Sequence, residues 1–235
     1  MLTDLNKKPS KTILVVLVLV GAILLLPLSA KHAEAREEYI GFSSLPKGPE
    51  DIYLILFENK PDDNLHDDDF ITDAAEAVGY TPPFQWHVEI MYYNHDHNEW
   101  LVMGCRPPQC SMDYPVKELL QHYQQPTIRI NRLKVPVEKQ IGARKFFAKR
   151  FQGKPYALAG PNETNCSDVP KELSDELRIG KVKSFTKQEL TKIPAIRTFL
   201  RRYRYKTIND LLKRDNITFP DAFENTGTRL GILRL

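Results

Sequence analysis

The chain has 235 residues, of which 42% are hydrophobic and 27% are charged, and its formal net charge is +3. This composition excludes a disordered chain, a collagen and a disulfide-dense scaffold, and it suffices for one domain with a sizeable core. The charge is unevenly divided, because residues 36–126 hold 17 Asp/Glu against 5 Lys/Arg and residues 127–235 hold 11 against 24. Two interpretations stay open: a basic surface for an anionic partner such as lipid headgroups, or two halves that neutralise each other by packing together.

Residues 1–35 have the pattern of an export signal. Three lysines, at positions 7, 8 and 11, precede an apolar run from Ile13 to Leu28 that no charge interrupts. This is the order of the n-region and h-region of a signal peptide, and Ala33 to Ala35 offers small residues for cleavage. The run is slightly long for a signal peptide and just short of a typical membrane span. A cleaved signal and a transmembrane anchor therefore both stay open, and either places the body outside the cytosol, in the periplasm or another extracytoplasmic space.

After a tether at residues 36–50, one domain is expected at residues 51–235, with strands and short helices in alternation. The predicted strands are apolar or alternating runs; they are Asp51–Phe57, His87–Tyr93, Glu99–Gly104, Thr127–Leu133 and Arg229–Leu233. The predicted helices are Phe70–Val78, Val116–Tyr123, Val137–Phe151 and one that follows Asn165. Thr186 and Glu189 have the spacing of a capping box. Antiparallel strands with helices segregated around them predict an α+β fold.

Two of the three cysteines lie close together in the sequence, and the third is separate. Cys105 and Cys110 flank a short turn-like segment and can form a local disulfide in an oxidising compartment. Cys166 is then left over, either as a reactive thiol or as an inert buried side chain.

The surroundings of Cys166 suit a nucleophile. Residues 154–165 form a loop rich in Gly, Pro and Asn, and Cys166 is expected to open the helix that follows. Unpaired N–H groups at a helix start stabilise a thiolate, and the same groups can hold the oxyanion that forms when a thiolate adds to a carbonyl.

A thiolate also needs a proton donor and acceptor, usually a histidine. The chain has six histidines, at positions 32, 66, 87, 95, 97 and 122, and all precede Cys166. His87 begins an apolar strand, which can hold a ring rigidly, whereas the others lie in the tether, in acidic loops or near a helix end. His87 is therefore the expected base, and the alternative is a hydrogen-bonded core histidine.

Two short motifs resemble a known group of enzymes. Pro155-Tyr156, Gly160 and Asn165-Cys166-Ser167 resemble the nucleophile segment of NlpC-type papain-like amidases. In the common arrangement the histidine follows the cysteine. Here Trp86-His87-Val-Glu-Ile-Met instead resembles the histidine-first motif of the circularly permuted branch. That branch includes the YiiX-like hydrolases and the lecithin–retinol acyltransferase-like enzymes.

The strand at Asp51–Phe57 and the segment Phe219 to Phe223 also resemble YiiX-like chains, so the resemblance covers residues 50–226. It implies a permuted papain-like fold and a Cys166–His87 pair, with the oxyanion contacted by Tyr156 and the Cys166 backbone. It also implies cleavage or transfer at an amide, ester or thioester of a peptide, cell-wall or lipid substrate. No metal or organic cofactor is implied. An exported body argues against nucleic acid, and the sequence leaves the oligomeric state open.

The chain departs from the branch at the third polar residue of the site. The branch usually places Glu or His on the strand after the histidine strand, and residues 100–105 contain neither. Glu89, at a position usually small in the branch, lies on the same strand face as His87 and is the expected orienter. The backbone or Gln109 is an alternative orienter, and Glu89 alternatively only meets a cation. Pro170 is expected to kink or shorten the nucleophile helix. A catalytically weak or inactive envelope binding module of the same fold is therefore the alternative function.

A metal-dependent hydrolase is the second enzyme hypothesis. His95, Asp96 and His97, with Glu99 and the acidic run 67–69, offer imidazole and carboxylate ligands. A polar hairpin turn is a poor catalytic platform, so no metal site is predicted.

Overall fold

The computed structural model describes residues 38–58, 74–123, 127–156, 164–194, 214 and 216–234. Contacts divide the chain into two units, Met1–Glu37 and Glu38–Leu235, and the described residues belong to the second unit. The predicted export segment, the acidic loop at 59–69 and the start of the predicted helix Phe70–Val78 lie outside the described residues. Within the described ranges no helix has the length and apolar character needed to cross a membrane.

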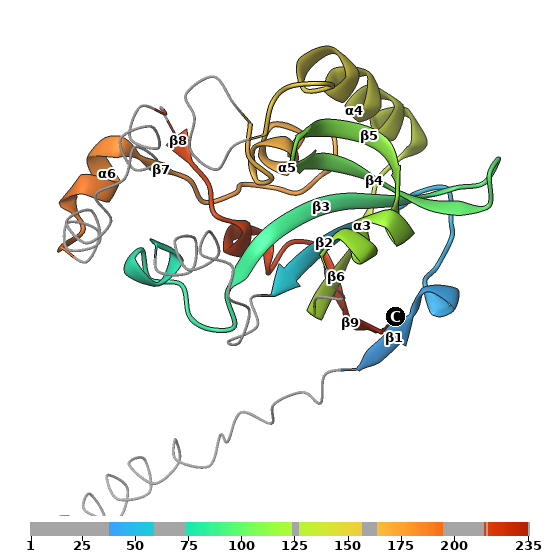
Figure 1. Cartoon of the computed structure of the whole chain (residues 1–235), viewed down its shortest axis with the longest axis horizontal. Coiled ribbons are helices and arrows are strands. Elements are labelled where there is room, and N and C mark those ends of the chain that lie inside the picture. Colours follow the sequence, from blue (N-terminus) through green and yellow to red (C-terminus); the bar gives the residue numbers. More distant parts are fainter. Residues whose placement is uncertain are drawn as a thin grey trace, which may run out of the picture. The chain divides into compact units, whose positions relative to one another are not determined.

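The folded unit is α+β, with a mostly antiparallel sheet (Figure 1). Among the described residues, seven strands run in the order β1-β9-β6-β2-β3-β4-β5, and only β1 and β9 of these pair in parallel. The strands are β1 (Tyr39–Gly41), β2 (Asp51–Glu58), β3 (Gln85–Asn94), β4 (Glu99–Arg106), β5 (Gln109–Pro115), β6 (Thr127–Lys134) and β9 (Thr228–Arg234). The other elements are η1 (Phe42–Ser44), α3 (Val116–His122), α4 (Val137–Arg150), α5 (Asp168–Glu172), β7 (Phe185–Thr186), α6 (Lys187–Lys192), β8 (Asn216–Ile217) and η2 (Pro220–Phe223).

Strand β2 is central and buried along its whole length. A strand that is covered on both faces has a continuous apolar sequence, and this run allowed Asp51–Phe57 to be predicted as a strand. Successive side chains of a strand point to opposite faces. Ile52, Leu54 and Leu56 accordingly join a first core cluster with α4, α5 and Cys166. Tyr53, Ile55 and Phe57 point to the other face and join a second core cluster with α3.

Three elements differ from the sequence-based expectations. Residues 38–50 were expected to form a tether, but they belong to the folded unit, because β1 pairs with β9 and Leu45 is buried. Strand β5 was not predicted; it follows β4 after only Pro107 and Pro108. The helix after Asn165 begins at Asp168 rather than at Cys166 and has five residues. The capping box at Thr186 and Glu189 is confirmed.

Candidate functional site

His87 is the third residue of β3 and lies opposite Phe57 of β2. Its side chain is 1% exposed. The imidazole contacts the rings of Phe57, Trp86 and Tyr123, at centroid distances of 5.2, 5.4 and 5.2 Å. Three aromatic neighbours therefore fix the orientation of the ring at the start of the strand.

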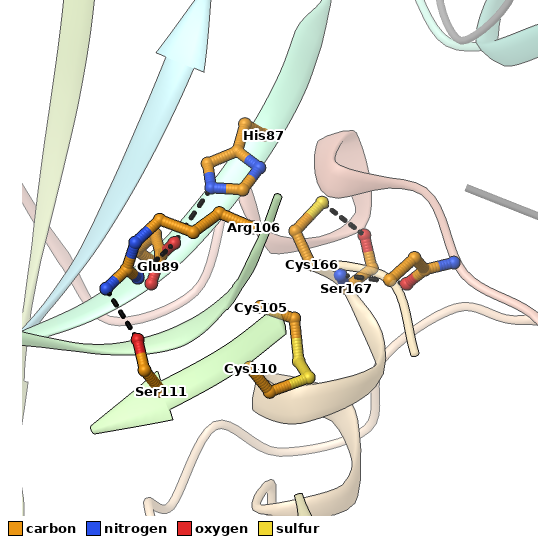
Figure 2. A network of polar contacts seen from close by, with 9 residues as sticks. His87, Glu89, Cys105, Arg106, Cys110, Ser111, Cys166 and Ser167 are labelled. Carbon is orange, nitrogen blue, oxygen red and sulfur yellow. Dashed lines mark hydrogen bonds and ion pairs between the residues drawn. A yellow bond between two sulfur atoms is a disulfide. The ribbon is translucent and has the colours of Figure 1, made fainter. Parts of the chain in front are cut away.

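Glu89 follows His87 by two residues and is fully buried. Its Oε1 atom lies 2.9 Å from Nε2 of His87 and also accepts a hydrogen bond of 3.0 Å from Nη1 of Arg106 (Figure 2). Burial alone acts to raise the pKa of the Glu89 carboxyl, but the charge of Arg106 and the contacts with His87 outweigh it and hold that pKa below its ordinary value. Glu89 is therefore a carboxylate between two cationic partners.

Gly104 of β4 provides the space that the Glu89 carboxylate occupies. A Cβ atom at position 104 would lie 2.5 Å from the carboxyl carbon of Glu89. Only glycine lacks that atom, so the buried carboxylate requires glycine at this position.

Cys166 lies beside His87, although the two residues are far apart in the sequence. Nε2 of His87 is bonded to Glu89, and Figure 2 shows the other ring nitrogen, Nδ1, on the side of the Cys166 sulfur. Burial lowers the pKa of His87, but the charge of a Cys166 thiolate, a hydrogen bond with Cys166 and the contacts with Glu89 raise it to about 9. The arrangement therefore favours the protonated form of the His87 imidazole.

The turn around Cys166 is held by its neighbour Asn165. The side-chain Oδ1 of Asn165 accepts hydrogen bonds of 3.0 Å from the N–H groups of both Ser167 and Asp168. Unpaired N–H groups were expected at the helix start, and these two amides are not among them, because the Asn165 side chain pairs with both. The N–H of Cys166 itself makes no hydrogen bond with another described residue, so it is the donor that an oxyanion can use.

Cys105 and Cys110 face each other across β4 and β5 and are joined by a disulfide. Both lie in the first core cluster with Cys166. Gln109, the alternative orienter of His87, is exposed at the start of β5. Tyr156 is half-buried, packs against the first core cluster and donates its backbone N–H to the carbonyl of Pro108 at 3.1 Å.

The considered metal ligands do not converge in the described part of the chain. His95, Asp96 and His97 are exposed in the turn between β3 and β4, and residues 67–69 lie outside the described ranges. Among the residues that the structure describes, no three His, Cys, Asp or Glu side chains are arranged to hold a metal ion.

Arg106 and Gly104 are the members of this network that sequence reasoning missed. Both lie on β4, two residues apart, and both contact Glu89. The sequence showed Arg106 only as a charged residue at the end of the apolar run 100–105. Its contact with Glu89 depends on the register that places β4 beside β3.

Comparison with known proteins supports the fold. No family model and no curated protein matches this chain. A search of solved structures finds the crystal structure of metalloprotein YiiX (DUF1105) from Escherichia coli O157:H7, with a TM-score of 0.53 and 17% sequence identity. The match covers 77% of this chain and 95% of YiiX. This chain therefore shares the YiiX-like fold.

Proposed function

We propose that this chain is a thiol hydrolase or acyltransferase of permuted papain-like fold, in which Cys166 is the nucleophile and His87 moves the proton. The observation that carries the proposal is the buried series Cys166, His87 and Glu89. The imidazole is bonded to a carboxylate through Nε2, and its pKa is raised to about 9 by the neighbouring thiolate and carboxylate. The YiiX-like fold is in keeping with the proposal. The motifs at 86–91 and 165–167 support it separately, because they resemble those of the YiiX-like hydrolases.

The proposed reaction has two halves. The Cys166 thiolate adds to a carbonyl carbon and forms a tetrahedral oxyanion; the oxyanion collapses as Nδ1 of His87 gives its proton to the departing amine, alcohol or thiol. The product is an acyl-thioester on Cys166. Water, or another acyl acceptor, then loses a proton to His87 as it attacks the thioester, and the thiolate–imidazolium pair is restored.

Two groups have supporting roles in this proposal. The Cys166 N–H donates to the oxyanion, and Tyr156 is proposed as the second contact. Glu89 orients the imidazole and stabilises its protonated form through the 2.9 Å bond to Nε2. This bond leaves Nδ1 as the nitrogen that serves the sulfur.

The proposed substrates are amides, esters or thioesters of peptide, cell-wall or lipid origin. We propose that the domain lies in the cell envelope or outside the cell, secreted or attached to the membrane, since residues 1–35 have the pattern of an export signal. Among the described residues no three His, Cys, Asp or Glu side chains are grouped to hold a metal ion. Oε1 of Glu89 is shared by Arg106 and His87, and its buried Oε2 makes no hydrogen bond with a described residue. The proposed reaction therefore includes no step on a metal ion, although YiiX is described as a metalloprotein.

Alkylation by iodoacetamide tests the activation of the thiol. Intact-mass measurement at neutral pH should show Cys166 labelled at least about tenfold faster in the wild type than in His87→Ala, because the imidazolium stabilises the reacting thiolate. Panels of amide, ester and thioester probes should then give product with the wild type and none with Cys166→Ala. Equal, slow labelling in both proteins would remove the basis of the proposal.

The burial of Cys166 favours one alternative, a catalytically weak or inactive binding module of the same fold. The side chain is only 2% exposed and packs in the first core cluster, so a carbonyl can reach the sulfur only if neighbouring chain moves. If Cys166→Ala keeps every cellular phenotype of the wild type and no probe is turned over, the binding module becomes the better account.

A further inference from the structure

We propose that Arg106 is a positioning residue of this site: its guanidinium holds the Glu89 carboxylate, and Glu89 in turn holds His87 with Nδ1 toward Cys166. The inference rests on the proposed function and adds a fourth member to the Cys166–His87–Glu89 series. Arg106 does not touch the reacting atoms, so its effect has to pass through Glu89.

The geometry around Arg106 is specific for a guanidinium. Nη1 donates to Oε1 of Glu89 at 3.0 Å, and Nη2 donates to Oγ of Ser111 at 2.8 Å. The guanidinium carbon lies 3.8 Å from the ring centroid of Tyr114. The plane is thus held by two directed hydrogen bonds and one aromatic face, and Figure 2 shows the bonds to Glu89 and Ser111. A lysine can supply the charge but not this planar fork.

The charges along the series alternate in sign. In the reactive state of the proposed function, a thiolate at Cys166, an imidazolium at His87, a carboxylate at Glu89 and the guanidinium of Arg106 sum to zero in a region where all four residues are at most 4% exposed. Without Arg106 the same group would carry one excess negative charge away from water, which is costly. The excess negative charge disappears when the site binds a proton. That proton is expected on Glu89, because this carboxylate loses its guanidinium partner.

A protonated Glu89 would support the imidazolium less well. His87, on the same strand as Glu89, and Arg106 of β4 are bonded to the Glu89 carboxylate directly, whereas Cys166 acts on it through His87. Tyr114 packs against the guanidinium of Arg106. Without Arg106, the thiolate–imidazolium pair should therefore form only at a higher pH than in the wild type. Loss of a merely structural ion pair would lower the amount of folded protein without moving the pH profile.

The chain offers a matched control. Arg132 of β6 makes a comparable paired contact, with Nε 2.7 Å and Nη2 3.0 Å from the two carboxylate oxygens of Asp51. Arg132 pairs with Tyr53 of β2, whereas His87 pairs with Phe57 of the same strand. The two positions on β2 are therefore four residues apart. Arg132→Gln removes the same charge from the same sheet without touching the site.

The test is the pH dependence of Cys166 alkylation by iodoacetamide, followed by intact mass between about pH 5 and pH 9. In Arg106→Gln the acidic limb of the rate profile should move to higher pH by about one unit or more, and in Arg106→Lys by less. Arg132→Gln should leave the limb in place. In a Glu89→Gln background, Arg106→Gln should cause no further shift, because the group through which Arg106 acts is gone.

An unmoved limb in folded Arg106→Gln, or a shift that persists in the Glu89→Gln background, would overturn the inference. If Arg106→Gln does not fold, Arg106→Lys decides: a limb that overlaps the wild type counts against the inference, and an upward shift supports it. The proposed function fails on a different comparison, namely wild type labelled no faster than His87→Ala. The two failures are therefore distinguishable.

Discussion

Two buried carboxylates, Glu89 on strand β3 and Asp221 packed against the start of that strand, have opposite surroundings. Glu89 lies between His87 and Arg106, and these partners hold its pKa below the ordinary value in spite of burial. Asp221 of η2 accepts the N–H of Gln85 at 2.9 Å through Oδ1. Its Oδ2 atom, like Oε1 of Gln85, has no hydrogen-bond partner among the described residues. Burial raises the pKa of Asp221 to about 6.

The difference shows that cationic partners, and not depth, distinguish the pKa values of these two buried acids. Burial acts to raise the pKa of both groups. The pH dependence of stability should consequently have opposite signs. The contribution of Glu89 is present above the ordinary carboxyl pKa and is lost as the pH falls through its lowered value. The contribution of Asp221 is present in acid and is lost as the pH rises through about 6.

Removal of the cation beside Glu89 should have the largest effect on stability. Arg106→Leu leaves a fully buried carboxylate with His87 as its remaining cationic partner, so the free energy of unfolding at neutral pH should fall by about 3 to 5 kcal/mol. Urea denaturation measures it. The double variant Glu89→Gln/Arg106→Leu should recover much of the loss, and a double variant as unstable as the single one would contradict a charge-based account.

Removal of the charge at Asp221 should have the opposite sign. Because the carboxyl titrates near 6 rather than at its ordinary 3.8, Asp221→Asn should stabilise the fold at pH 8 by about 2 to 3 kcal/mol. The gain should vanish near pH 4, where Asp221 is already protonated. Denaturant midpoints at the two pH values test this, with Asp96→Asn in the exposed turn as the control. A gain of equal size at both pH values would show that the carboxyl charge is not the cause.

A methyl group at position 104 should test how firmly Glu89 is held. Gly104→Ala places an atom where the pinned carboxylate lies, so it should cost about 2 kcal/mol of unfolding free energy. In a Glu89→Ala background the same change should cost close to nothing, because the space is then free. Thermal denaturation of the four proteins gives the coupling directly, and additive costs would mean that Glu89 moves aside easily.

The smallest expected effect is at Ser111. Ser111→Ala removes the acceptor of the 2.8 Å bond from Arg106 but leaves the bond to Glu89. We expect a loss of about 1 kcal/mol in urea denaturation. A loss as large as that of Arg106→Leu would mean that the Tyr114 stack and the Glu89 contact do not hold the guanidinium by themselves.

The sequence was sufficient for the strands that carry a clear pattern. The buried run of β2 and the apolar runs of β3 and β4 were recognisable because covered faces demand apolar side chains. Strand β5 was not, because Asp113, with a φ of 60°, and Pro115 break its pattern. Strand β1 is three residues long and is defined by pairing with the distant β9, which no local pattern reveals.

For the site, alternation along β3 was enough to put His87 and Glu89 on one face, and the motif around Cys166 suggested its partner. Arg106 and Gly104 could not be found in this way. Their relation to Glu89 depends on the register between β3 and β4 and on the space that a missing Cβ leaves, and both are properties of the folded chain.

The titration of His87 by NMR tests the central claim most directly, since the claim is a thiolate–imidazolium pair held by Glu89. In the wild type the imidazole should stay protonated until about pH 9, and in Cys166→Ala its pKa should fall toward the ordinary 6.5, because the charge of the thiolate is gone. An imidazole that titrates near 6.5 in both proteins would contradict the account.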